Sequence, residues 1–141
     1  MIDIESMVVD SVYNAVKTQY PKCDVISEYN DTPSQFPCVQ IVEADNYTYR
    51  RTQDNDLTEH HASVMYEVNV FSNKKTGKKT EAKAIAEIVD STMQGMKFTR
   101  TLKQPIPNKD KTIYRIVARY EAVVGAGVEI NKNTVYQMYR K

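Results

Sequence analysis

The stretch Ala62-Ser-Val-Met-Tyr-Glu-Val-Asn-Val-Phe-Ser-Asn73 places an apolar residue at every second position. Val64, Tyr66, Val68 and Val70 fall on one side of an extended chain, and β-branched and aromatic residues in this pattern are typical of a strand with one buried face. A slip of one residue would turn the whole apolar row to the other side, so the register is well specified. We expect a strand over 62–73, around which the fold is organised.

A second run with the same period covers residues 112–124. We expect the two runs to share one sheet, with the tyrosine row under helices and the arginine row on the other side. Tyrosines interleaved with arginines can stack single-stranded RNA, but a stacking platform needs both on one open face. With Val117 and Val123 beside them, the charged residues would instead suit a polar, specific interface between subunits. The apolar row is Tyr114, Ile116, Ala118, Tyr120, Ala122 and Val124, and it alternates with Arg115, Val117, Arg119 and Glu121.

Helical periodicity predicts two helices, over 3–20 and 80–96. Asp3 and Thr80 are the expected N-caps, because their side chains can accept hydrogen bonds from the first helical N–H groups. The apolar stripes are Ile4, Met7, Val8, Val12, Ala15 and Val16 in the first helix and Ala82, Ile85, Ala86, Val89 and Met93 in the second.

Shorter strands are predicted over 24–29, 38–43 and 98–102. Residues 45–61 lack an apolar period, so we expect a long loop or β-arm there. Residues 128–141 are expected to form a C-terminal arm or a hairpin about the turn at 131–134. The predicted fold is α+β, an antiparallel sheet with two helices packed on one face, in a single domain spanning 1–141.

Charge is distributed unevenly along the chain. The net charge of +1 argues against a generic nucleic-acid binder. Residues 1–61 hold 11 acidic and 4 basic residues, whereas residues 62–141 hold 7 acidic and 15 basic. Two interpretations stay open: the halves form oppositely charged faces that pack head to tail against another copy, or they interleave and the charges mix.

The two cysteines, Cys23 and Cys38, do not form a disulfide framework. The acidic start of the chain lacks the character of a secretory signal, and no apolar run is long enough to span a bilayer. We expect a soluble protein with free thiols, made in a reducing cytoplasm and not associated with membranes.

Motifs for catalysis and metal binding are weak. Residues 54–61 are rich in possible ligands, but they lack the glycine and the final glutamate of a calcium loop, and His60 and His61 point to opposite sides of an extended chain. A cysteine could meet one of these histidines only by chance of folding, and there is no phosphate-binding glycine motif. We expect no catalytic residue, no metal and no cofactor, and a protein that is not an enzyme.

A basic cluster precedes the second predicted helix. It consists of Lys74, Lys75, Lys78 and Lys79. These lysines could bind phosphate, but such a run is more often a solubilising turn.

Several of these stretches resemble the tail terminator, or tail-completion (tail-to-head joining), proteins of long-tailed phages and phage-tail-like particles. The resemblance covers residues 1–125 in the same element order, and residues 128–141 are less similar. The stretches are Phe36-Pro37-x-Val39-x-Ile41-x-Glu43 with Asp45-Asn46, then Val64-x-Tyr66-Glu67-Val68-Asn69-Val70-Phe71-Ser72-Asn73, then the lysine-rich helix start, then Thr112-Ile113-Tyr114-Arg115 with Ala118-Arg119-Tyr120.

The resemblance implies a structural virion protein that is assembled in the host cytoplasm and lies at the tail or neck. Such subunits form a homo-oligomeric ring, typically a hexamer, which caps the tail tube protein and stops tube polymerisation. The ring then presents a docking surface to the head connector, and DNA passes through its opening without sequence-specific binding.

Residues on the predicted arm and on the second long strand are the candidate contacts for the tube or for a neighbouring subunit. Tyrosine and arginine are enriched at such interfaces. On this hypothesis, deletion of residues 47–58 leaves a folded monomer that no longer caps tails. The interface candidates are Tyr47, Tyr49, Arg50, Arg51, Arg115, Arg119 and Glu121.

Two other roles stay open. The protein could be another neck component, such as a head-completion or connector protein, whose loss would let filled heads leak DNA. It could also be a small nucleic-acid-binding protein that uses the lysine cluster, in which case DNA retention would depend strongly on salt.

Overall fold

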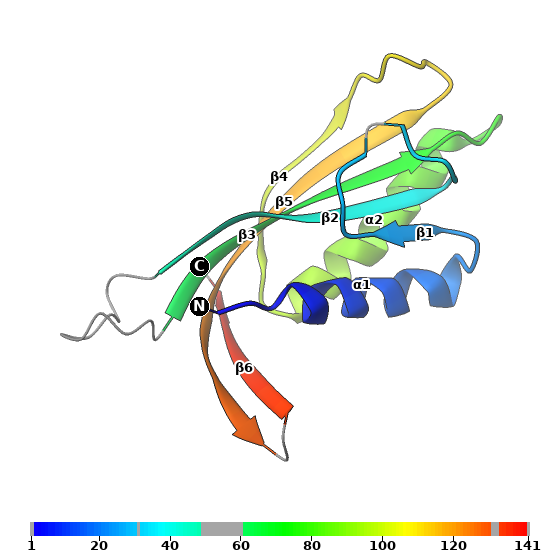
Figure 1. The fold of residues 1–141 in the computed structure, drawn as a ribbon. Helices are drawn as coiled ribbons and strands as arrows, with labels where there is room; N and C mark the ends of the chain where they lie inside the picture. Colours follow the sequence, from blue (N-terminus) through cyan, green and yellow to red (C-terminus); the bar gives the residue numbers. More distant parts are fainter. Residues whose placement is uncertain (1, 31, 49–60, 131–132, 141) are drawn as a thin grey trace.

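The computed structural model describes residues 2–30, 32–48, 61–130 and 133–140, and within them it contains two helices and one sheet. The element order and the α+β class agree with the sequence prediction, and the sheet is mostly antiparallel (Figure 1). The helices are α1 (Glu5–Gln19) and α2 (Lys78–Gly95). The strands are β1 (Asp24–Ile26), β2 (Cys38–Thr48), β3 (His61–Ser72), β4 (Thr99–Ile106), β5 (Tyr114–Ile130) and β6 (Asn133–Arg140).

Strand β3 occupies the middle of the sheet, in the order β1-β2-β3-β5-β4, and β6 pairs with β5. It runs antiparallel to both neighbours, so that Ile41, Val68 and Ala118 form one cross-strand row. The two sequence runs with period two therefore share one sheet, as predicted, and in it they lie side by side. β1 departs from the antiparallel expectation: it pairs parallel to β2, because the 27–37 segment returns the chain to the end of the sheet where β1 began.

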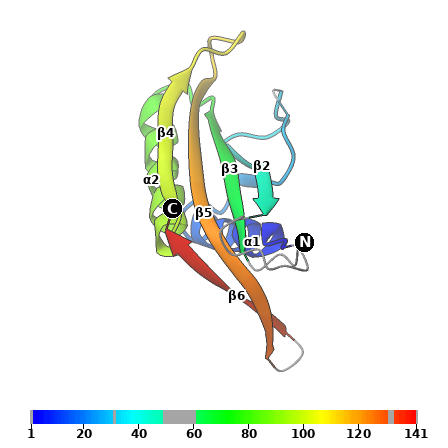
Figure 2. The same ribbon diagram turned by 90° about the vertical axis from the view of Figure 1, so that its left-hand side faces the viewer.

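Both helices cover the same face of the sheet (Figures 1 and 2). The predicted stripe of α2 is confirmed, since all five of its apolar residues are buried. In α1 the buried helical residues are Val8, Val12 and Val16, and Ile4 is buried just before the helix.

Both predicted N-caps are wrong. The N-cap of α1 is Ile4, although Asp3 lies close by and its Oδ1 accepts a 3.1 Å hydrogen bond from the Glu5 N–H. Helix α2 begins two residues before Thr80, and its N-cap is Gly77 with φ 88°. Glycine adopts this left-handed conformation without a steric cost, so the turn geometry decides where the helix starts.

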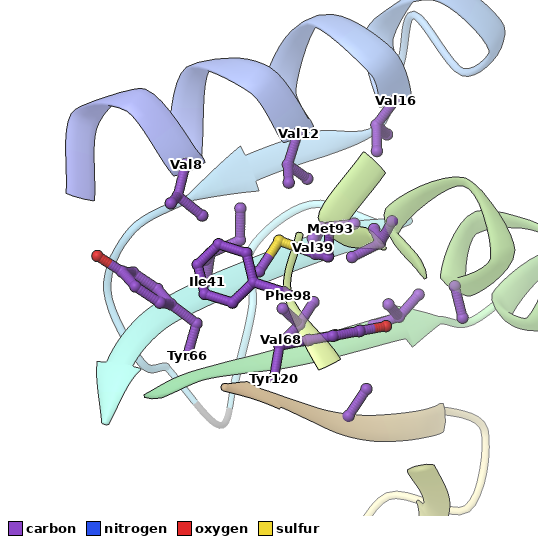
Figure 3. Packing of buried hydrophobic residues seen from close by; sticks show 14 of the residues in the cluster. Val8, Val12, Val16, Val39, Ile41, Tyr66, Val68, Met93, Phe98 and Tyr120 are labelled. Atoms are coloured by element: carbon purple, nitrogen blue, oxygen red, sulfur yellow. The ribbon is translucent and has the colours of Figure 1, made fainter. Parts of the chain in front are cut away.

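The hydrophobic core lies between the helices and the sheet (Figure 3). Val8, Val12 and Val16 point from α1 toward it, and the Tyr66 ring packs edge-on against Phe98 at 5.7 Å. Tyr66 and Tyr120 are the two largest fully buried side chains among the described residues.

The hydroxyls of these two tyrosines have acceptors. The Tyr66 hydroxyl donates to Glu43 Oε1 at 3.2 Å, and the Tyr120 hydroxyl donates to Asp90 Oδ1 at 2.8 Å. Burial, followed by the neighbouring carboxylates, raises the pKa of both phenols. Each ring therefore fills the core while its polar atom is satisfied, which fixes how deeply it sits.

Three strands are longer than predicted. β2 continues to Thr48, because residues 45–48 pair with β3 after a register shift between Glu43 and Asp45. The predicted arm therefore does not begin at 45, and its remainder, 49–60, lies outside the described residues. β4 includes Pro105, which an edge strand tolerates since one side of its backbone needs no partner.

β5 continues through Gly125 and forms a hairpin with β6. The last pair between β3 and β5 is His61 with Gly125, so the pairs from Val128–Val135 to Ile130–Asn133 join only β5 and β6. This end of the hairpin extends beyond the rest of the molecule (Figures 1 and 2). Neither of the helices in the described part of the chain is long and apolar enough to cross a membrane.

Candidate interaction surface

One face of the sheet is covered by neither helix, and we call it the helix-free face. Its side chains alternate along β3 and β5 with those of the core, and directly paired residues on neighbouring strands share a face. Its members on the three central strands are Cys38, Gln40, Val42, Asp45 and Tyr47 on β2, Ser63, Met65, Glu67, Asn69 and Phe71 on β3, and Arg115, Val117, Arg119, Glu121 and Val123 on β5.

Arg115 organises the end of this face near the loops 27–37 and 107–113. Its Nε and Nη2 donate to Asn69 Oδ1 at 3.0 and 2.8 Å. Its guanidinium lies 5.3 Å from the Phe71 ring centroid and 5.6 Å from that of Tyr29. Phe71 is fully buried although no helix covers it, because Arg115 packs on it from the paired strand.

The loop 27–37 is held over the same end of the sheet by Gln40. The Asn30 N–H donates to Gln40 Oε1 at 3.0 Å, and Gln40 Nε2 donates back to the Asn30 carbonyl at 2.5 Å. Gln40 has no exposed surface, and this reciprocal pair satisfies its amide. The loop therefore has a defined position from which Tyr29 reaches Arg115.

An ion pair marks the middle of the helix-free face. Arg119 Nε lies 3.2 Å from Glu67 Oε1, and the two residues are direct cross-strand partners. Their side chains are 48% and 25% exposed, so water screens the pair and its contribution to stability is small. Both charges remain accessible to a partner molecule.

Tyrosines frame the opposite end of the face. Tyr47 on β2 and Tyr139 on β6 are 48% and 40% exposed, and the row that joins them crosses Ser63 and Val123. The Tyr139 ring also packs against the His61 ring, and their centroids are 5.5 Å apart. With Tyr29, three of the four exposed large hydrophobic side chains in the described part of the chain border this face. Exposed tyrosine is a mark of interaction surfaces.

The sequence predicted one buried face for β3, and the second face proves to be largely buried as well. Asn69 and Phe71 have no exposed surface, and Val117 and Val123 on β5 are only 2% and 7% exposed. The Arg115 side chain packs on Phe71 and donates to Asn69. The two valines, expected to contribute to an interface, are therefore covered within the chain itself.

Of the predicted interface residues, Tyr47, Arg115, Arg119 and Glu121 are brought together on the helix-free face. The other three, Tyr49, Arg50 and Arg51, lie outside the described residues. Tyr29, Asn69 and Tyr139 were missed. Tyr29 reaches the face only through the folded loop and Tyr139 only through the β6 pairing, so their sequence neighbourhoods show no signal for this role. Asn69 lies on β3, where the alternation indicates its face but not its bond to Arg115.

The unequal charge of the two halves becomes a spatial separation. α1, β1 and β2 occupy one side of the molecule, and β5 and β4 occupy the other (Figure 2). Residues 1–48 contain eight acidic and two basic side chains, whereas residues 97–111 contain five basic and one acidic. The strand order thus favours the first of the two interpretations: the halves do not interleave within the sheet.

The four clustered lysines lie at the start of α2 and just before it. Lys74, Lys75 and Lys79 are exposed, whereas Lys78 is half-buried and its Nζ donates to the Lys111 carbonyl at 2.7 Å. Lys78 therefore connects the loop before β5 to the start of α2. The other three remain available to solvent or to an anion.

Residues discussed for catalysis or metal binding are not assembled in the described part of the chain. No group of three or more potential ligand side chains occurs there, and residues 54–60 lie outside it. Cys23 and Cys38 are buried free thiols, and burial raises their pKa to about 12 and about 11. Cys38 pairs with Phe71, at the other end of β3 from His61, so neither thiol meets that histidine.

Comparison with known proteins adds no assignment: no family model matches the chain, and no curated protein matches it.

Proposed function

We propose that this protein is a structural virion subunit, a tail terminator that forms a ring on the end of the tail tube. The ring stops tube polymerisation, provides the docking surface for head connector or neck proteins, and lets DNA pass through its opening. The proposal starts from the sequence resemblance, which implies a homo-oligomer, typically a hexamer, found in the tail or neck of the virion after assembly in the host cytoplasm.

The separation of charge between the two sides of the sheet is the observation that carries the proposal. A ring needs a heterologous contact, in which one surface of each subunit meets a different surface of the next. The acidic side, with α1, β1 and β2, and the basic side, with β4, form such a complementary pair. Electrostatic complementarity of this kind sets the register and orientation of two partners more than it sets their affinity.

Two further features support a role in assembly. The helix-free face presents exposed tyrosines and the Glu67–Arg119 pair, a composition suited to a polar protein interface. The end of the β5–β6 hairpin extends beyond the subunit and can reach a neighbour (Figure 1). On this proposal the helix-free face and the hairpin contact the tube or the adjacent subunit.

Removing the gene tests the proposed function directly. Electron micrographs of the resulting particles should show overlong tails or tails without heads. Filled heads that leak DNA would instead indicate a head-completion or connector role. Tubes of normal length that join to heads in the absence of the protein would refute the proposal.

Charge reversal tests the proposed ring contact. Lys103 is exposed on the outermost strand β4, and K103E should weaken self-association and tail capping. Lys22 is exposed in the turn between α1 and β1, at the opposite edge of the sheet from β4, so K22E changes the net charge equally and serves as the matched control. Sedimentation velocity at low and high salt, with and without tube protein, measures the difference. Equal loss in both variants would show that net charge, not the β4 edge, matters.

The predicted arm needs a redesigned deletion. The 47–58 deletion would remove Tyr47 and Thr48, which are paired with β3, and would damage the sheet. Replacement of 49–60 by a short Gly-Ser linker leaves room for a turn between Thr48 and His61, so it keeps every described strand and tests the arm alone. Capped tails of normal length with this variant would show that the arm is dispensable.

A further inference from the structure

A cavity of about 430 Å³ lies at the end of the sheet where the loops 27–37 and 107–113 meet. Figure 2 shows both loops at the same end of the molecule. The volume is within the range of small-ligand sites. Arg115 lines the cavity, together with the apolar side chains of Pro33, Phe36 and Ile113.

Arg115 is a half-buried cation that no described carboxylate neutralises. In the described part of the chain its polar partner is the neutral amide oxygen of Asn69, which accepts from Nε and Nη2. The rings of Tyr29 and Phe71 lie over its guanidinium. The Nη1 group has no acceptor among the described residues. A half-buried guanidinium that keeps free donors is a strong site for an anion, because a charge-assisted hydrogen bond offsets its desolvation.

A second unsatisfied donor belongs to the same cavity. Asn108 lines it, and the Asn108 Nδ2 atom is buried without a hydrogen-bond partner in the described structure. Buried donors in folded proteins are nearly always satisfied, so this amide indicates an acceptor that comes from outside the chain. Lys109 lies on the same wall and adds positive charge.

Asp110 restricts the charge of a ligand. Its carboxylate also lines the cavity, and it accepts hydrogen bonds from the Thr112 N–H at 2.9 Å and the Thr112 hydroxyl at 2.6 Å. These bonds lower the pKa of Asp110, so the group is ionised at neutral pH. Asp110 is exposed, so water screens its charge, but a negative charge on the cavity wall still disfavours a dianion such as a phosphate monoester more than a monoanion.

We propose that this cavity binds a carboxylate that a partner polypeptide presents beside an apolar or aromatic side chain. Arg115 Nη1 and Asn108 Nδ2 would donate to the carboxylate oxygens, and Phe36, Pro33 and Ile113 would contact the neighbouring apolar group. Within a protein interface, such a pocketed carboxylate would be an anchor residue. The site does not depend on the proposed function, because it follows from the cavity and its unsatisfied donors alone.

Small probes test the site on the full-length protein. N-acetyl-phenylalanine carries a terminal carboxylate, and the amidated dipeptide N-acetyl-Phe-Glu-amide carries a side-chain carboxylate. We expect at least one to bind with a dissociation constant on the order of 1 mM, the scale for a ligand of this size. Chemical shift changes at the Arg115 Nε–H and the Asn108 side-chain amide would locate the bound probe. The probe that binds more tightly shows whether the site prefers a terminal or a side-chain carboxylate.

Matched controls keep the test decisive. N-acetyl-phenylalanine amide lacks the charge and should bind at least about ten-fold more weakly, and phenyl phosphate should not bind more tightly than the carboxylates. N108A should weaken carboxylate binding by about ten-fold without unfolding the protein, because Asn108 lies on an exterior loop. R119Q, on the same strand but outside the cavity, should bind normally.

Several outcomes would overturn the proposal. Equal binding of the neutral amide would show an apolar pocket, and tighter binding of phenyl phosphate would show a phosphate site. Shifts confined to residues away from the cavity, or equal weakening by N108A and R119Q, would place the binding elsewhere. Absence of any shift at probe concentrations well above the expected dissociation constant would show that the cavity binds no carboxylate.

Discussion

The two faces of the sheet are built from the same strands, but different interactions bury them. The core face is covered by two helices and is mainly apolar, and its polar groups are hydrogen-bonded, among them the hydroxyls of Tyr66, Tyr120 and Ser72. On the helix-free face, Phe71 and Asn69 are as deeply buried, but the cover is Arg115 and its neighbours. Burial alone therefore does not identify the core. A face covered by apolar helix side chains stabilises the fold. A face covered by a charged side chain such as Arg115 can also bind a partner.

The largest expected difference is between two tyrosines on opposite faces. Tyr66 is fully buried against Phe98, so Y66A should lower the free energy of unfolding by about 3–5 kcal/mol, because it removes a large apolar surface and leaves a cavity. Tyr47 is 48% exposed, and Y47A should lower it by less than about 1 kcal/mol. Urea unfolding of the two variants measures the contrast.

Y66F is the control for the polar atom. It keeps the ring but removes the hydroxyl that donates to Glu43, and it should cost about 1 kcal/mol. If Y47A destabilised the protein as much as Y66A, the helix-free face would be a second core.

The next contrast compares two arginines on β5. R115M keeps an unbranched chain over Phe71 but leaves Asn69 Oδ1 without its donors, so we expect a loss of about 1–3 kcal/mol. R119M removes only a screened surface pair and should cost about 0–1 kcal/mol. Equal costs in chemical denaturation would contradict the view that Arg115 acts as the cover of this face.

A smaller effect depends on pH. Burial holds the Cys38 thiol protonated to about pH 11, whereas in the unfolded chain it ionises near its ordinary value of 9.0. Below pH 9 the Cys38 thiol is protonated in both the unfolded and the folded state, so this group does not change the free energy of unfolding. Above it the unfolded thiol loses its proton first, and stability falls until the folded thiol also ionises.

Between pH 8 and pH 10 this linkage should cost about 1 kcal/mol for Cys38, from about 1.4 kcal/mol per pKa unit. The Cys23 thiol, with a pKa of about 12, lies in the core cluster and should behave in the same way over this range. Urea unfolding at both pH values, for the wild type and for C38A, isolates the contribution of Cys38. An identical pH dependence in C38A would show that this thiol is not the cause.

The sequence predicted the core face well and the helix-free face only in part. Val64 to Val70 and Ala82 to Met93 follow the periods of a strand and a helix, because burial by other elements acts on them in the same direction as their local preference. Strand ends were harder. Residues 45–48 and 125–130 carry weak strand signals, and pairing with β3 or β6 satisfies their backbone.

The candidate surface shows the same division. Alternation along β5 placed Arg115, Arg119 and Glu121 on one face, which the register bears out. Tyr29 and Asn69 could not be assigned, because their contacts with Arg115 join residues that are 86 and 46 positions apart in sequence. No local pattern encodes such contacts. They follow from how the loop 27–37 folds back over the sheet.

The smallest expected effect sharpens the comparison most, because it separates stability from recognition. A double-mutant cycle with E67Q and R119Q should give a coupling energy of about 0.2–1 kcal/mol that decreases as salt is added, since both side chains are partly exposed. The charge swap E67R/R119E should restore that coupling and leave the monomer folded. On the proposed interface role it should still impair tail capping, because a partner would then meet inverted charges. Normal capping by the swapped variant would show that this ion pair only connects two strands and takes no part in docking.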